Sequence, residues 1–208
     1  MTDNYGLTDT DTVSIIVEPP VAVTIILQAG NNPNEINFAG NSGKDLSDPG
    51  NIDFDAGAWT IGGETYFQRG AFKFDLSGIP PNSIIVSARL SLFSNPTPVN
   101  GNLIDANSGP NNSMYIRQIS TNWQVGSATW QNQPSTETEK EILIPHTSLS
   151  FLDLTDIDVT ELVTRMHTIN NYGFLISLKN EVIYTIRQFA SSKHPNTSKH
   201  PKLVVVYE

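Results

Sequence analysis

Cationic side chains fall on the polar faces of several predicted strands. In the stretch 68–75, Arg69 and Lys73 alternate with Phe72 and Phe74, and residues two apart in a strand share a face. Arginine binds carboxylates through two parallel hydrogen bonds. Cations from neighbouring strands would therefore form one surface for a ligand that carries carboxylates. The candidate ligand-binding cations are Arg69, Lys73, Arg89, Arg117 and Arg187.

The same cations also allow a second interpretation, in which they form ion pairs within the sheet. Asp75, Glu64 and Glu181 are candidate partners, and opposite charges on adjacent strands attract. The formal net charge is −9, so acids are plentiful. The sequence leaves the basic surface and the internal ion pairs as alternatives.

Aromatic side chains offer surfaces on which sugar rings can stack. Trp59 and Tyr66 flank a Gly-Gly pair at 62–63, which is typical of a hairpin turn. We predict that these two rings form a platform at the rim of the molecule. Trp130 is predicted to close the hydrophobic core. Trp123 suits the core and a sugar platform equally.

Acidic residues gather in the region 35–55, which is rich in Asn and Gly. Calcium takes six to eight oxygen ligands, and Asp45, Asp48, Asp53 and Asp55 are the candidate ligands for a structural Ca²⁺ ion. Their spacing is not that of an EF-hand. The alternative is that these acids hold turns in a solvated loop.

Composition excludes several functional classes. The chain has no cysteine, which excludes disulfides and thiolate metal sites. Its acidity argues against nucleic-acid binding, and no apolar run reaches the roughly 20 residues of a membrane-spanning helix. There is no GxSxG, HExxH or phosphate-binding glycine loop, so we predict that the domain is not an enzyme.

Short alternating segments predict an all-β fold. The stretch 68–93 reads as two strands joined by a turn at Ser77–Ser83, and further strands follow up to 203–207. The segment 156–167 has apolar residues at helical spacing and predicts one short helix. Eight to ten strands with one helix indicate an antiparallel β-sandwich of jelly-roll type.

Several ordered segments resemble the DNRLRE-type domain, a carbohydrate-binding module family. They include 72–77 (FKFDLS), 87–92 (SARLSL), 129–134 (TWQNQP), 171–174 (NYGF) and 201–205 (PKLVV). The resemblance runs from about Val21 to Glu208. It implies a non-catalytic β-sandwich attached to a secreted enzyme or surface protein, and some members bind alginate.

Residues 1–20 resemble the end of a different domain. The segment 12–17 alternates as a single strand, similar to the last strand of a PKD-type or immunoglobulin-like module, and Pro19-Pro20 would be a stiff linker. The alternative is that 12–17 is the first strand of the main domain. We predict two units, 1–20 and 21–208, cut from a longer protein.

Together these patterns predict a monomeric module that binds a polysaccharide, such as an alginate-like polyuronate. Its other partners would be further domains of the parent chain, on the surface of or secreted from a bacterium or archaeon. The alternative is a structural or adhesion spacer that has no glycan site.

Overall fold

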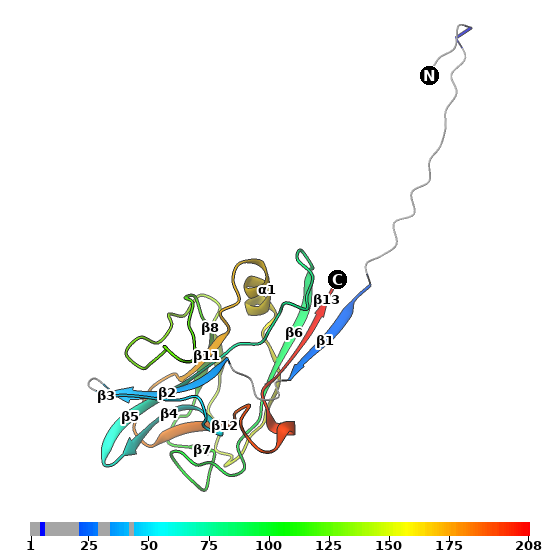
Figure 1. The fold of residues 1–208 in the computed structure, drawn as a ribbon. Helices are drawn as coiled ribbons and strands as arrows, with labels where there is room; N and C mark the ends of the chain where they lie inside the picture. Colours follow the sequence, from blue (N-terminus) through cyan, green and yellow to red (C-terminus); the bar gives the residue numbers. More distant parts are fainter. Residues whose placement is uncertain (1–4, 7–20, 29–33, 42–43) are drawn as a thin grey trace.

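The computed structural model describes residues 5–6, 21–28, 34–41 and 44–208. The predicted strand 12–17 and Pro19-Pro20 lie outside the described residues. The remaining chain forms two β-sheets with a short α-helix at one end (Figure 1).

The smaller sheet has four strands in the order β1-β13-β6-β10, and each neighbouring pair is antiparallel. Its strands are β1 (Val23–Gln28), β6 (Ile85–Leu92), β10 (Leu154–Asp158) and β13 (Lys202–Tyr207).

The larger sheet has nine strands. The main path is β7-β12-β4-β5-β11-β8-β9, and β2 pairs with both β5 and β3. Its strands are β2 (Glu35–Asn41), β3 (Lys44–Asp48), β4 (Asp53–Ile61), β5 (Glu64–Phe72), β7 (Asn107–Ser108), β8 (Met114–Gln118), β9 (Ile142–Ile144), β11 (Phe174–Leu178) and β12 (Thr185–Ala190).

Apolar side chains from both sheets form one core. Leu90 and Val205 come from the smaller sheet, and Phe72, Phe174 and Met114 come from the larger one. All five are buried. Apolar side chains from two sheets that interdigitate in this way define a β-sandwich, so the predicted fold class is confirmed.

The helix α1 (Thr160–Thr168) is shorter than predicted at its N-terminus. Residues Leu154–Asp158 form β10 and pair with β6 instead. The strand ends and the helix begins where Asp158 Oδ1 accepts hydrogen bonds from the backbone N–H of Thr160 at 3.0 Å and from its hydroxyl at 2.6 Å. The predicted apolar stripe is confirmed, because Val159, Leu162, Val163 and Met166 are all buried.

The stretch 68–93, predicted as two strands joined by a turn, divides between the two sheets. Its first half belongs to β5 in the larger sheet, and its second half is β6 in the smaller sheet. Both strands bury the predicted face: Gly70 and Phe72 in β5, Ala88 and Leu90 in β6. The cations of these two strands therefore belong to different sheets.

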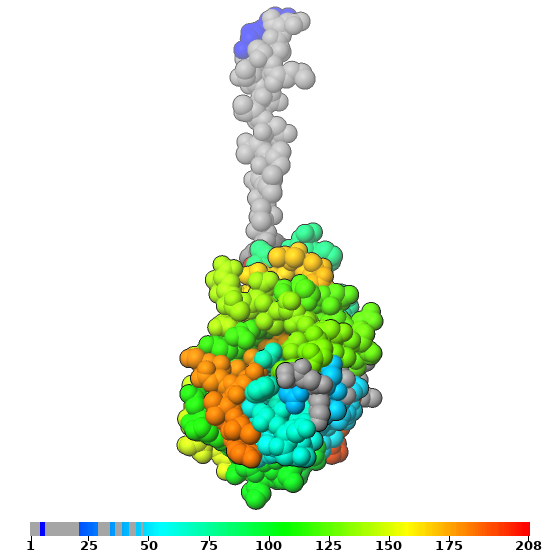
Figure 2. Space-filling model, turned by 90° about the vertical axis from the view of Figure 1, so that its left-hand side faces the viewer, coloured from blue at the N-terminus to red at the C-terminus, as the bar shows by residue number. Residues whose placement is uncertain are grey.

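The glycine pair predicted to form a turn does so between β4 and β5. Ile61 pairs with Glu64, and both intervening glycines have positive φ, 60° for Gly62 and 85° for Gly63. Two left-handed residues give the tight turn that matches the twist of a hairpin. Figure 2 shows this hairpin tip (cyan) beside the segment before β12 (orange). The rings of Trp59 and Tyr184 pack edge to face, with their centroids 5.3 Å apart.

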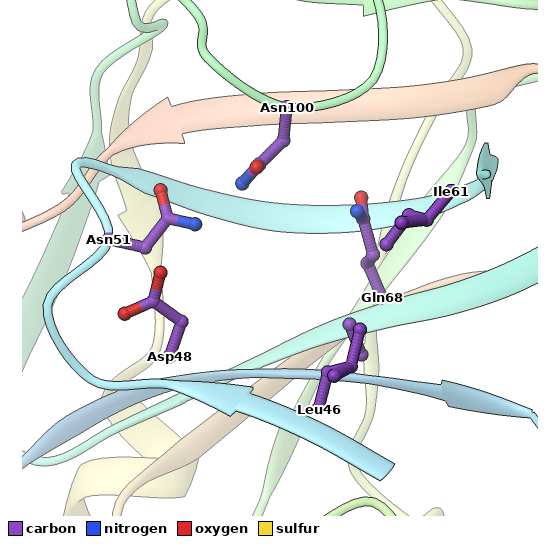
Figure 3. A pocket seen from close by; sticks show the side chains of 7 residues that line it. Leu46, Asp48, Asn51, Ile61, Gln68 and Asn100 are labelled. Atoms are coloured by element: carbon purple, nitrogen blue, oxygen red, sulfur yellow. The ribbon is translucent and has the colours of Figure 1, made fainter. Parts of the chain in front are cut away.

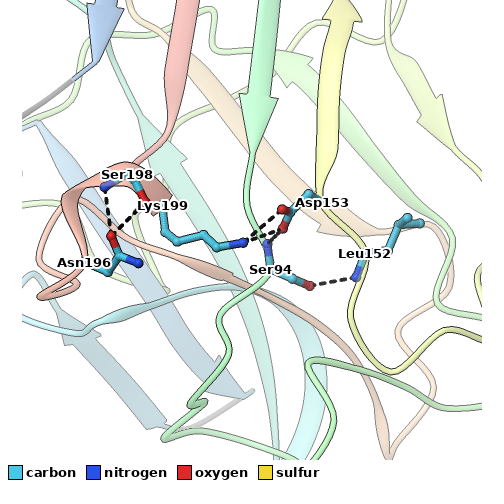
Figure 4. Close-up of polar contacts among 6 residues, drawn as sticks. All are labelled: Ser94, Leu152, Asp153, Asn196, Ser198 and Lys199. Carbon is cyan, nitrogen blue, oxygen red and sulfur yellow. Dashed lines mark hydrogen bonds and ion pairs between the residues drawn. The ribbon is translucent and has the colours of Figure 1, made fainter.

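The loop between β12 and β13 is attached to the smaller sheet by polar contacts (Figure 4). Lys199 Nζ lies 2.9 Å from the carboxylate of Asp153, which also accepts the backbone N–H of Ser94 at 2.9 Å. The short 3₁₀ helix Thr197–Lys199 is capped by Asn196, which accepts the N–H of Ser198. The charge of Lys199 in this loop is thus paired with an acid from the segment just before β10.

Candidate functional site

Two arginines lie on the same outer face of the larger sheet. β11 lies between β5 and β8, and its residue Leu175 is opposite both Ala71 and Arg117. Arg69 is two residues before Ala71 on β5 and so shares its face. Arg69 and Arg117 therefore flank β11 on one surface. We call the surface formed by Arg69, Arg117, Tyr115 and Trp130 the arginine face.

Arg69 is held by three side chains. Its Nε and Nη2 atoms donate to the two carboxylate oxygens of Glu181 at 2.7 and 2.9 Å, and Nη1 donates to Gln133 Oε1 at 3.0 Å. Its guanidinium also lies over the ring of Trp130, 4.7 Å from the ring centroid. The internal ion pair with Glu181, one of the two alternatives for Arg69, is present.

Arg117 is held less completely. Its Nε donates to Glu141 Oε2 at 2.6 Å, and Nη1 is 3.4 Å from Ser177 Oγ. The guanidinium lies over the Tyr115 ring at 4.3 Å. Nη2 forms no hydrogen bond with any residue that the structure describes. The side chain is 21% exposed, so Arg117 is partly accessible from the surface.

A small hydrophobic cluster supports this surface from one side. Ala71, Ile119, Trp123, Ala128 and Leu175 are buried together, with Trp130 and Tyr172 packed against them. The Trp123 indole donates its Nε1–H to the carbonyl of Tyr172 at 2.7 Å, so this tryptophan belongs to the cluster and not to an exposed platform.

Trp130 packs on the sheet and does not enter the main core. It is stacked on Phe67 with ring centroids 6.1 Å apart. Asp45 fixes its backbone, because Asp45 Oδ1 accepts the N–H of Trp130 at 2.6 Å. The Trp130 ring therefore stays beneath the Arg69 guanidinium, as part of the arginine face.

Of the other predicted cations, Arg89 and Arg187 do not join the arginine face. Arg89 lies on β6 in the smaller sheet and pairs with Asp158 at 3.0 Å. Lys73 follows the end of β5 and is half-buried. Arg187, on β12 next to the edge strand β7, is 1% exposed, so its guanidinium does not reach the surface.

Trp59 and Tyr66 lie opposite each other on β4 and β5, away from the arginine face. Tyr66 is buried and Trp59 is half-buried. Successive residues of β5 point to opposite faces, so Tyr66 and Gln68 point away from the side that carries Phe67 and Arg69. The sequence did not single out Gln133, Glu141, Ser177 or Tyr115, whose positions depend on strand pairing.

The four predicted calcium ligands separate into two pairs. Asp45 and Asp48 lie on β3 and accept backbone N–H groups, Asp48 from Gly50 at 2.9 Å. Asp53 and Asp55 are buried on β4. Across the described ranges, no three His, Cys, Asp or Glu side chains come together as a metal site would require.

Asp53 is held in a network of neutral donors. Its carboxylate accepts the side chain of Asn95 and the backbone N–H groups of Val99 and Asn100, the last two at 2.7 Å. Burial raises the pKa of Asp53 above its ordinary value, although these hydrogen bonds act in the opposite direction. Asp53 and Asp55 are therefore buried carboxylates that polar neighbours already bind.

Calcium binding stays a prediction with a simple test. A Ca²⁺ ion that binds only the folded state raises the melting temperature, so EGTA should lower it if calcium is structural, and added Ca²⁺ should restore it. Mg²⁺ serves as the control, because it favours a smaller octahedral site. A melting curve that EGTA leaves unchanged would count against the ion.

The fold and the surface define a class of protein: a β-sandwich with two arginines on an exposed sheet face. The model of carbohydrate-binding module family 96 matches residues 57–207, and the chain belongs to this family. It is therefore a non-catalytic module that binds polysaccharide. No curated protein matches the chain significantly. In the described part of the chain, no helix is long and apolar enough to cross a membrane.

Proposed function

We propose that this module binds an anionic polysaccharide, such as a polyuronate of the alginate type, on the arginine face. The observation that carries the proposal is Arg117, which lies near the surface over Tyr115 with one terminal nitrogen not engaged. A uronate carboxylate can accept from that nitrogen. Sugar rings of the same chain would contact Trp130 and Tyr115.

Rigid positioning would favour this binding. Each guanidinium is held against an aromatic ring and one glutamate, so little side-chain entropy is lost when a ligand binds. The glutamates also limit the affinity, because they neutralise the charge that attracts the polymer. Binding to this face would therefore be moderate in strength and would weaken as salt is added.

The proposal predicts opposite effects for the two members of one ion pair. Arg117→Gln should lower the affinity for alginate by about fivefold to tenfold, or about 1 to 1.4 kcal/mol, the upper part of the net range for one ordinary hydrogen bond. Glu141→Gln should raise the affinity, because it removes the acid that competes with the uronate. Isothermal titration calorimetry with alginate, pectate and a neutral glucan measures both.

Arg89→Gln is the matched control, because Arg89 also pairs with one acid but lies on the smaller sheet. It should leave alginate affinity unchanged. Binding to neutral glucans alone, or a loss of affinity in both the Arg117 and the Glu141 variants, would rule out the charge mechanism. A glycan panel that gives no signal would favour the spacer role instead.

The wider setting is part of the same proposal. Carbohydrate-binding modules are typically extracellular, which supports a secreted or cell-surface parent protein in which this module is one of several domains. Such a module would act as a monomer and keep its parent close to the polysaccharide. Size-exclusion chromatography with light scattering tests the monomer.

A further inference from the structure

A small pocket opens on the other side of β5 from the arginine face. It has a volume of about 150 Å³, and the residues that line it come from β2, β3, β5, the end of β4 and two loops. Figure 3 shows Asp48, Asn51, Gln68 and Asn100 around the pocket, with Leu46 and Ile61 beside them. Gln68 is opposite Ala39 on β2, whereas Arg69 points to the opposite face.

The strongest indication of a ligand is Gln68. The side chain is buried, with an exposed fraction of 5%, and its Oε1 atom accepts no hydrogen bond within the described part of the chain. Folded proteins pair nearly all their buried polar atoms. Gln68 lines the pocket, so its amide group is suited to a ligand that brings a donor.

The neighbouring polar groups are each held by one hydrogen bond and keep another atom for a ligand. Asp48 Oδ1 accepts the N–H of Gly50 at 2.9 Å, and Asn51 Oδ1 accepts the N–H of Asp53 at 2.9 Å. Asn100 donates from Nδ2 to Asp55 Oδ2 at 2.9 Å. The second carboxylate oxygen of Asp48 and the Asn51 amide nitrogen add an acceptor and a donor.

This combination matches the hydroxyl groups of a sugar. A hydroxyl both donates and accepts, so vicinal hydroxyls can satisfy the carboxylate and the amides together. Leu46 and Ile61 are each 44% exposed and supply aliphatic surface for the C–H groups of the ring. The volume is below the roughly 300 to 1,000 Å³ of pockets that enclose drug-sized ligands, which suits a single sugar ring.

The charge of the pocket selects against acidic sugars. Asp48 lines it, Asp53 and Asp55 lie buried behind Asn51 and Asn100, and none of the described lining residues is cationic. A uronate carboxylate would be repelled here. We propose that this pocket is a subsite for one neutral sugar residue, separate from the arginine face and independent of what that face binds.

Titrations followed by ¹H–¹⁵N NMR test the proposal with glucose, galactose, mannose and glucuronate. At least one neutral sugar should shift the Gln68 side-chain amide and the backbone signals of Ala39 and Asn100, with a Kd of about 1 to 10 mM. Glucuronate should bind at least tenfold more weakly. Shifts with none of the three neutral sugars, or equal binding of glucuronate, would overturn the subsite.

Two variants locate the binding. Gln68→Met keeps the size of the side chain and removes its polar atoms, so it should abolish the sugar-induced shifts without lowering the melting temperature. Asp48→Asn changes an exposed side chain, which makes misfolding of little concern, and should weaken neutral-sugar binding by about fivefold. Unchanged sugar binding in both variants would place the site elsewhere and overturn the proposal.

The same variants separate this proposal from the one for the arginine face. The Gln68→Met and Asp48→Asn variants should bind alginate as tightly as the unsubstituted module does. The Arg117→Gln variant should bind the neutral sugar with unchanged affinity. Failure of one site therefore leaves the result at the other intact.

Discussion

Replacing Arg187 with methionine is expected to raise the free energy of unfolding by about 1 to 3 kcal/mol, because it removes a buried charge that forms no ion pair with the described residues. Arg187 is 1% exposed, and all other residues of its strand β12 are buried as well. None of its three guanidinium nitrogens has a hydrogen-bond partner among the described residues. Methionine is unbranched and adapts to irregular space, so it fills most of the volume.

The pKa of Arg187 gives the direction and the approximate size of the expected change in the free energy of unfolding. Burial lowers this pKa from 12.5 to about 10. One pKa unit corresponds to 1.36 kcal/mol, so the shift represents roughly 3 kcal/mol that opposes folding while the group is charged. For a base whose folded pKa is lowered, this cost is complete below the folded pKa and is relieved only as pH rises above it. At neutral pH the methionine variant avoids all of it.

Urea unfolding at pH 7 measures the effect, with Arg89→Met as the control. Arg89 is 43% exposed and paired with Asp158, so its loss should change stability by less than about 1 kcal/mol. A decrease above about 1 kcal/mol for Arg187→Met would contradict the prediction, because it would mean that the guanidinium has a bound partner inside the protein.

Arg187 also shows where strand alternation misleads. The sequence placed it on a polar face because it alternates with Ile186 and Gln188. All six residues of β12 are buried, however, so neither face of this strand is open to solvent. In such a strand, alternation no longer separates buried from exposed positions.

Local patterns predicted the faces of β5 and β6 correctly, because one face of each strand is apolar and a shift of one residue would expose it. They also located the 62–63 turn and the buried stripe of α1. The ion pairs could not be located in this way. Arg69 and Glu181 are 112 residues apart, and only the order of strands in the sheet brings them together.

The two candidate sites differ in how far the sequence indicated them. Arg69 and Arg117 were named from their residue type and strand position, and the fold brings them onto one face. The pocket around Gln68 was not predicted, although Asp48 was named as a metal ligand. Its wall combines residues from four strands and two loops, and neutral amides carry no sequence signal that distinguishes a ligand site from ordinary surface.

The second large effect is expected at Gly173, where alanine should lower the free energy of unfolding by more than about 4 kcal/mol. Gly173 has a φ of +86°, and an added Cβ would lie 2.2 Å from the backbone carbonyl oxygen of Phe72. Because that oxygen belongs to the paired strand β5, no side-chain movement relieves the contact. Urea unfolding measures the change.

Gly63→Ala separates the two causes of the expected loss, which are the contact with the Phe72 carbonyl and the strain of a positive φ. Gly63 has almost the same φ, +85°, but an added Cβ there meets nothing within 4 Å. It should therefore cost only the left-handed backbone strain, about 1 to 2 kcal/mol. Equal losses at the two positions would show that strand β11 moves away from β5 without penalty. Such movement would also displace Ile119, whose N–H donates to the Gly173 carbonyl at 2.9 Å, and with it the cluster that supports Trp130 beneath Arg69.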